Sequence, residues 1–186
     1  TEERLARLAP HLGEIRLSIY DDTPWPERVA ALAKAPVTFG VNLLVTPERV
    51  AALGATLHRL EALGCRDVAL LRYVGPDTTQ QLSHADERRV VAALARCTMS
   101  VRLSVCFGDH LGALPRLFDG DGPSGDCGAG GEFLVLTSER TVKQCSFASG
   151  GPSVRTADDV LRVYREQRDV LRAPVAKAGC ARANRD

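Results

Sequence analysis

Short apolar segments alternate with amphipathic segments in the first part of the chain, and this alternation restricts the possible folds more than any other feature. Four segments have the length and the Val, Leu and Ile content of strands, at residues 14–20, 37–45, 67–74 and 99–107. Helical spacing is found at residues 1–12, 27–35, 46–63 and 85–97. Strands separated by helices pair in parallel through right-handed crossovers. The sequence therefore predicts an α/β fold whose apolar strands are covered on both faces.

The predicted sheet is small, and a helix precedes its first strand. Four strands are half of the eight that close a full (βα) barrel. We therefore expect a partial (βα) parallel barrel, which is either a piece of a larger barrel or a sheet that needs a partner at its first edge.

A glycine-rich corner and a predicted hairpin follow, framed by Cys127 and Cys145. Residues 133–136 and 142–145 are the predicted strands, with the turn between them. The hairpin brings its two ends together, so the two cysteines can converge. Glycines beside Cys127 permit a tight turn and leave backbone N–H groups free to point at sulfur. Such a pair of thiolates suits a soft metal or an iron–sulfur cluster.

The rest of the composition excludes several classes of protein. The net charge of +1 gives no electrostatic case for binding nucleic acid or a membrane surface. No apolar run approaches the ~20 residues of a membrane span. Six sparse cysteines and a start unlike a signal peptide favour the reducing cytoplasm. A C-terminal helix is predicted at residues 157–172, capped by Thr156 and ended by Pro174.

Taken in order, these motifs resemble the C-terminal half of a radical S-adenosylmethionine enzyme with a SPASM or twitch extension. Residues 1–108 resemble the C-terminal part of the barrel, and residues 109–186 resemble the extension, which holds an auxiliary [4Fe–4S] cluster. The most specific match is Cys127-x-x-Gly130, followed by a hairpin closed by Cys145, a helix and a late Cys180. The resemblance implies that these three cysteines bind the cluster. Either Cys106 is the fourth ligand, or one iron stays open for substrate.

Three strand motifs add to the resemblance. Ser18 lies in a segment similar to the fourth barrel strand, where a serine often contacts the cofactor, and Asn42 lies in one similar to the fifth. Arg72, Tyr73 and Val74 resemble the end of the sixth strand, which packs on adenine. The resemblance therefore implies that these residues bind S-adenosylmethionine. A buried Arg72 also needs an anionic partner, either a carboxylate of substrate or cofactor or a helix glutamate.

The family uses a reduced cluster to cleave S-adenosylmethionine, and the 5′-deoxyadenosyl radical then takes a hydrogen atom from substrate. The resemblance implies a peptide substrate, as in natural-product maturation, or a small molecule, and an electron donor such as a flavodoxin or ferredoxin. The defining Cys-x-x-x-Cys-x-x-Cys motif is absent from this sequence. We expect it in a missing N-terminal half of the barrel, so this chain alone should be inactive. The hairpin tip also lacks the Asp-Gly of the family.

Simpler interpretations remain open. The cysteines could be structural thiols, or they could hold zinc in a non-catalytic binding or interaction module on an α/β scaffold. A plain α/β barrel enzyme with incidental cysteines is a third possibility. Cys106 could belong to the core, and Ser18 and Asn42 could be edge residues. Asp109 and His110 form either an acid–base pair or part of a solvated loop.

Overall fold

The computed structural model of the protein describes residues 2–107, 111, 127–175 and 180. The helices of the first part are α1 (Glu2–Leu8), α2 (Trp25–Lys34), α3 (Pro47–Val50), α4 (Leu53–Ala62) and α5 (His84–Leu94), with short 3-10 turns η1 (Ala9–His11), η2 (Thr78–Gln80) and η3 (Val105–Phe107). Its strands are β1 (Glu14–Ile19), β2 (Thr38–Val45), β3 (Asp67–Arg72) and β4 (Ser100–Leu103). The later part contains β5 (Val135–Leu136), β6 (Val142–Lys143), α6 (Ala157–Glu166) and α7 (Arg168–Arg172).

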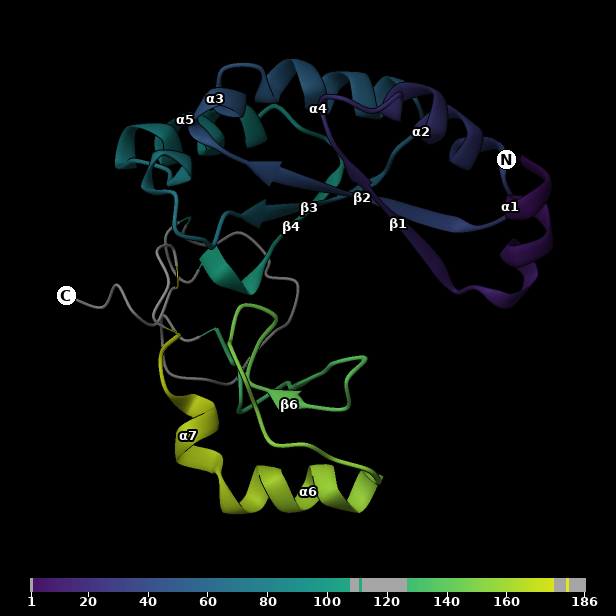
Figure 1. The fold of residues 1–186 in the computed structure, drawn as a ribbon. Helices are drawn as coiled ribbons and strands as arrows, with labels where there is room; N and C mark the ends of the chain where they lie inside the picture. The colour runs from purple at the N-terminus through teal and green to yellow at the C-terminus, as the bar shows by residue number, and fades with distance from the viewer. Residues whose placement is uncertain (1, 108–110, 112–126, 176–179, 181–186) are drawn as a thin grey trace.

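The first part is a parallel sheet in which the strands follow one another in chain order, β1-β2-β3-β4. Helices α2 to α5 lie on one face of this sheet (Figure 1). The predicted α/β class and the four parallel strands are thus confirmed. The described strands form an open sheet, with β1 and β4 at its edges.

The two faces of the sheet differ in chemistry, because side chains alternate along each strand. The face toward the helices carries the buried core, to which Val41, Val68 and Leu70 contribute. The opposite face, here called the open face, carries half-buried polar residues such as Arg16 and Asn42. The expectation that both faces are covered is therefore wrong for the described residues. The sequence predicted two covered faces because apolar residues also occupy the strand ends on the open face.

Two predicted elements end earlier in the structure. The helix predicted at residues 46–63 is divided into α3 and α4 by a turn at Ala51 and Ala52. The fourth strand stops at Leu103, and the N–H of Phe107 then donates to the carbonyl of Ser104, which closes a turn. Cys106 consequently lies on η3 rather than at the end of a strand.

The later part has a small core of its own. β5 and β6 form a small antiparallel pair, which matches the predicted hairpin only loosely because each strand has two residues. Thr156 caps α6 as predicted, but the C-terminal helix is broken at Gln167 into α6 and α7. The buried core of this part consists of Val142, Val154, Val163 and Leu171.

The helices are short throughout the described chain. The longest is α5, with 11 residues. None of the helices in the described ranges combines the length and apolar character that a membrane crossing requires.

Candidate four-cysteine site

Four of the six cysteines come from different segments and line one cavity. Cys106 lies on η3, Cys127 opens the glycine-rich corner, Cys145 follows β6, and Cys180 lies close to the C-terminus. The described residues that line this four-cysteine cavity are Val74, Val105, Cys106, Cys127, Ala129, Phe133, Cys145, Phe147, Val175 and Cys180. Apart from the thiols, every lining residue that the structure describes is apolar. The structure thus brings together all four cysteines that the sequence analysis selected.

The thiols of this cavity influence one another. Burial is the largest cause that raises the pKa of the Cys106 thiol, to about 12. The negative charge of the other three cysteines raises it further, whereas the nearby guanidinium of Arg72 lowers it. Several thiolates can therefore coexist here only with a compensating positive charge, which a metal provides.

The donor set suits a thiophilic metal, and the space is small. Thiolate sulfur is the ligand of zinc and of iron–sulfur clusters. The cavity volume is about 30 Å³, close to the volume of one water molecule in the liquid. A cluster therefore requires the segments that carry the cysteines to move outward. Among the described residues, which include all four thiols, no three His, Cys, Asp or Glu side chains are grouped closely enough to hold a metal ion.

The glycine-rich corner at Cys127 is held in place by the C-terminal helices. Gly130 has a φ of +73°, and a Cβ placed there would lie 1.8 Å from the carbonyl oxygen of Leu171. The hydroxyl of Tyr164 donates to the carbonyl of Gly131 at 3.0 Å. The glycine at position 130 is thus required both by its backbone conformation and by contact with α7.

Two of the glycine N–H groups that were predicted to face sulfur donate to carbonyl groups of the turn instead. The N–H of Gly130 donates to the carbonyl of Phe133 at 2.9 Å, and that of Gly131 donates to the carbonyl of Gly128 at 3.0 Å. These two donors stabilise the turn itself. The expectation that they are free to point at sulfur is therefore wrong, because a tight turn uses its own N–H groups to close.

Ser18 and Asn42 are neighbours on the open face, where they are paired in register between β1 and β2. The side-chain amide of Asn42 donates to the hydroxyl of Ser18 over 3.5 Å, and its oxygen accepts from Nε of Arg16 at 2.9 Å. Arg16 also donates to Asp67 at 2.7 Å, and Arg102 donates to the same carboxylate at 2.8 Å. These charged residues, with Glu14, form a network across the sheet, here called the strand network.

The strand network was missed by the sequence analysis, although Gly40 gives a signal for it. A Cβ at Gly40 would lie 2.6 Å from Nη1 of Arg16 and 2.8 Å from Oδ1 of Asp67. A glycine inside a strand marks a close approach by another group. Here that group is the guanidinium of Arg16, which crosses β2 to reach β3.

The three residues from the end of β3 occupy different surroundings. Val74 lines the four-cysteine cavity. The hydroxyl of Tyr73 accepts from the N–H of Asp77 at 3.4 Å, within the loop that follows β3. Arg72 is only 7% exposed, and neither its Nε nor its Nη1 has a hydrogen-bond partner among the described residues. The five residues predicted to bind S-adenosylmethionine are thus divided among the open face, this loop, the cysteine cavity and, for Arg72, the helix face of the sheet. Asp109 and His110 lie outside the described residues.

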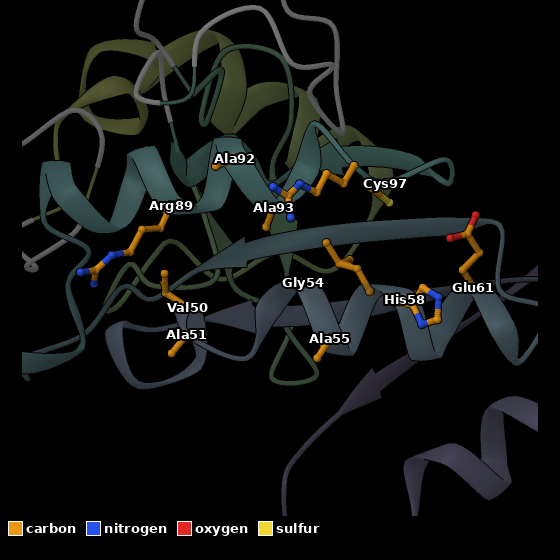
Figure 2. Close-up of a pocket in the computed structure, with 12 residues that line it drawn as sticks. Val50, Ala51, Gly54, Ala55, His58, Glu61, Arg89, Ala92, Ala93 and Cys97 are labelled. Atoms are coloured by element: carbon orange, nitrogen blue, oxygen red, sulfur yellow. The ribbon is translucent and has the colours of Figure 1, made fainter.

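A larger groove lies between α4 and α5, on the outer side of the helix layer (Figure 2). Its volume is about 570 Å³. Small residues such as Gly54, Ala55 and Ala93 form much of its wall, and His58 and Glu61 lie toward one end. The cysteine cavity is smaller but has the convergent reactive groups that a site requires, and we therefore regard it as the candidate site.

Protein-family models, curated proteins and solved structures were all compared with this chain, and none of them matches it.

Proposed function

We propose that this chain is part of a radical S-adenosylmethionine enzyme and that it holds an auxiliary [4Fe–4S] cluster on Cys106, Cys127, Cys145 and Cys180. One observation carries the proposal, namely that thiols from four separate segments line a single apolar cavity. Four cysteine thiolates are the usual ligand set of such a cluster. Cys106, which the sequence analysis left as one option for the fourth ligand, belongs to the set.

The architecture of the first part supports the proposal. Parallel strands in sequential order, with their helices on one face, are the arrangement found in a barrel wall. In parallel α/β folds, ligands bind at the carboxyl ends of the strands. Val74 and Cys106 follow the carboxyl ends of β3 and β4, so the cysteine cavity lies at that end.

The residues of the cavity have distinct tasks in this proposal. A bound iron–sulfur cluster would supply one-electron transfer. The apolar side chains of Phe133, Phe147 and Val175 exclude water, which strengthens electrostatic interactions in the site. Ser18 and Asn42 on the open face would contact S-adenosylmethionine. A peptide substrate, a flavodoxin or ferredoxin as electron donor, and a further part that supplies Cys-x-x-x-Cys-x-x-Cys complete the proposed enzyme, which we place in the cytoplasm.

Anaerobic reconstitution with iron and sulfide tests this proposal. We expect about one cluster per chain, four iron and four sulfide, with visible absorbance. Single substitutions of serine for each of the four cysteines should lower the iron content. The matched control is Cys97→Ser, which removes a half-buried thiol outside the cavity. Wild-type protein that stays colourless, or Cys127→Ser protein that binds as much iron as wild type, would contradict the proposal.

A zinc-binding interaction module is the second candidate, because four cysteines also form a common structural zinc site. In this case the chain would be non-catalytic. Purified protein would contain one zinc per chain and no iron, and a chelator would destabilise the fold. Elemental analysis of protein purified without oxygen distinguishes the two candidates directly.

A further inference from the structure

The groove between α4 and α5 has an apolar floor and low walls. The side chains of Val50 and Leu57 at its floor are buried, whereas the small residues Gly54, Ala55 and Ala92 of its walls are exposed. The labelled residues of α4 and α5 form two rows, one on each side of the groove (Figure 2). Of the residues that the structure describes, none lines both this groove and the cysteine cavity. The groove is therefore a separate surface from the candidate metal site.

Gly54, in the first turn of α4, is not explained by contacts within the fold. Its φ is outside the positive range, so its backbone conformation does not require glycine. A Cβ built at this position meets no atom within 4 Å. Glycine nevertheless weakens a helix relative to alanine. Because side chains at the contact set how closely two helices approach, the missing side chain lets a third helix lie close to α4.

Two arginines mark the side of the groove that α5 forms. Arg89 lies in α5 and Arg96 follows its C-cap, so the two are seven residues apart, or about 10 Å along a helix axis. The side chain of Arg89 is 71% exposed, and its contact with Asp86 is long, at 3.5 Å. Exposed pairs of this kind contribute little. Arg96 is exposed and forms no ion pair within the part of the chain that the structure describes. Both guanidinium groups can therefore bind an anion from outside.

The side of the groove that α4 forms does not balance this charge. Glu61 is the one carboxylate in the lining that the structure describes, and it accepts a hydrogen bond from the hydroxyl of Thr98. His58 is exposed and lies toward the same end of the groove (Figure 2). The groove therefore presents two cations on one side and a single engaged carboxylate on the other, which favours an acidic partner.

We propose that the groove between α4 and α5 is a docking site for an acidic amphipathic helix of a partner protein. Such a helix lays small apolar residues along the floor and presents two carboxylates, seven residues apart, to Arg89 and Arg96. Residues i and i+7 lie two turns apart on the same face of a helix, which matches the spacing of the two arginines. This inference does not depend on metal binding and goes beyond the proposed function.

The distribution of charge along the groove favours a helix over a small molecule. A site for a small molecule has polar groups that converge on the ligand. Here Arg89 lies toward one end of the groove, and His58 and Glu61 lie toward the other (Figure 2). A helix reaches both ends at once. Its apolar contacts would supply most of the affinity, and the arginines would set its orientation.

Binding of a synthetic helical peptide to the full chain tests the proposal. The peptide has about 16 residues, long enough to populate a helix. It carries alanine and leucine on one face and two glutamates, seven residues apart, beside that face, with a fluorescent label for anisotropy measurements. We expect saturable binding by wild type, and absence of binding would overturn the proposal.

Gly54→Leu tests the floor and wall of the groove. The new side chain fills the space above α4, so the glutamate peptide should bind about tenfold more weakly. The variant should remain folded, because leucine favours a helix and no atom lies within 4 Å of the added Cβ. The matched control is Gly13→Leu, where a Cβ also meets nothing within 4 Å. Equal binding by wild type and Gly54→Leu would overturn the proposal.

Charge reversal tests the arginines. Arg89→Glu and Arg96→Glu should each weaken binding of the glutamate peptide severalfold, and the double variant should prefer a peptide with lysines in place of the two glutamates. Arg165→Glu, at an exposed position on α6, is the control. Binding that neither reversal changes would overturn the proposal.

Two further measurements distinguish other occupants. Equally tight binding of a peptide of the same composition but interrupted by prolines would show attraction by charge alone, and a dimer that Gly54→Leu dissociates would show that a second copy fills the groove. Either result would overturn the proposal. Iron content after reconstitution should be the same in wild type and Gly54→Leu, so the proposed function is judged independently of the groove.

Discussion

At the scale of single residues, Gly40 and Asp67 show how β1, β2, β3 and β4 are connected on the open face. The missing side chain at position 40 lets Arg16 cross β2. Asp67 then accepts hydrogen bonds from Arg16 and from Arg102 of β4. One carboxylate therefore links the first and last strands of the sheet.

Gly40→Ala should destabilise the protein by about 1–3 kcal/mol, because the new methyl group displaces a guanidinium held by several hydrogen bonds. Chemical denaturation measures the change. The cost should shrink in an Arg16→Met background, where the clash is absent. Gly13→Ala is the control, since a Cβ at that position meets no atom within 4 Å. An equal cost in both backgrounds would contradict the packing described here.

The pH dependence of stability should show the contribution of Asp67. Burial raises the pKa of this carboxyl, but hydrogen bonds from Arg102 and Arg16 outweigh burial and leave the pKa below its usual value of 3.8. Ionised Asp67 thus stabilises the fold fully above pH 3.8, and this contribution is lost as the pH falls through the lower folded-state pKa.

Asp67→Asn should therefore be less stable than wild type at pH 7, and the difference should shrink on acidification below pH 3.8. Urea denaturation between pH 7 and pH 2.5 measures it. Asp22→Asn, at an exposed position, is the control. A difference that stays constant over this range would show that the charge of Asp67 does not stabilise the fold.

At the scale of elements, the glycine-rich corner and the C-terminal helices form one unit. Gly130 contacts the backbone of α7, and Tyr164 of α6 donates to the carbonyl of Gly131. The position of Cys127 is thus set by helices that follow it by about 30–45 residues. A hairpin by itself would not hold this corner.

Gly130→Ala should be considerably more destabilising than Gly150→Ala. Both glycines have nearly the same positive φ, +73° and +70°, so both alanines carry the backbone cost of about 1–2 kcal/mol. Only at position 130 does the added Cβ collide with backbone, 1.8 Å from the oxygen of Leu171. Hydrogen exchange in α6 and α7 would report the difference. Equal exchange in the two variants would show that α7 does not support the corner.

At the scale of the whole molecule, the cysteine cavity joins two parts with separate cores. Val74, Val105 and Cys106 come from the α/β part, and Cys127 and Cys145 come from the part with β5 and β6. Among the residues that the structure describes, the two buried cores have no member in common. A metal bound by all four cysteines would therefore fasten these parts to each other.

Metal uptake should slow hydrogen exchange in both parts together. We expect increased protection around residues 72–74 and 105–107 and around residues 128–131 and 142–148, because ligands bound to one centre lose independent motion. Helix α4, none of whose residues lines the cavity, serves as the internal reference. Cys145→Ser should abolish the protection in both parts. Protection confined to one part would mean that the metal is not shared.

Much of the fold could be predicted from the sequence. The period of the apolar residues indicated the four strands and the helices between them, because both patterns depend on near neighbours in the chain. Element ends were less accurate, as at Ala51, where no glycine or proline marks the break, and at Leu103, where the apolar character continues beyond the strand. The sequence could not show which side chains of a strand lie on the open face of the sheet. Leu44 and Leu71 lie there, yet they are as apolar as the residues that face the helices.

The four cysteines were selected from a local motif, a resemblance and a late position in the chain. That they share a cavity was decided by the tertiary structure, because η3, the glycine-rich corner and the C-terminal segment meet only when the two cores are formed. The burial of Arg72 at the end of β3, and the crossing of Arg16 above Gly40, also depend on contacts between strands distant in sequence. The sequence alone determined which elements form, since local pattern governs them. Packing between distant segments decided which side chains face each other, and with that the chemistry of the site.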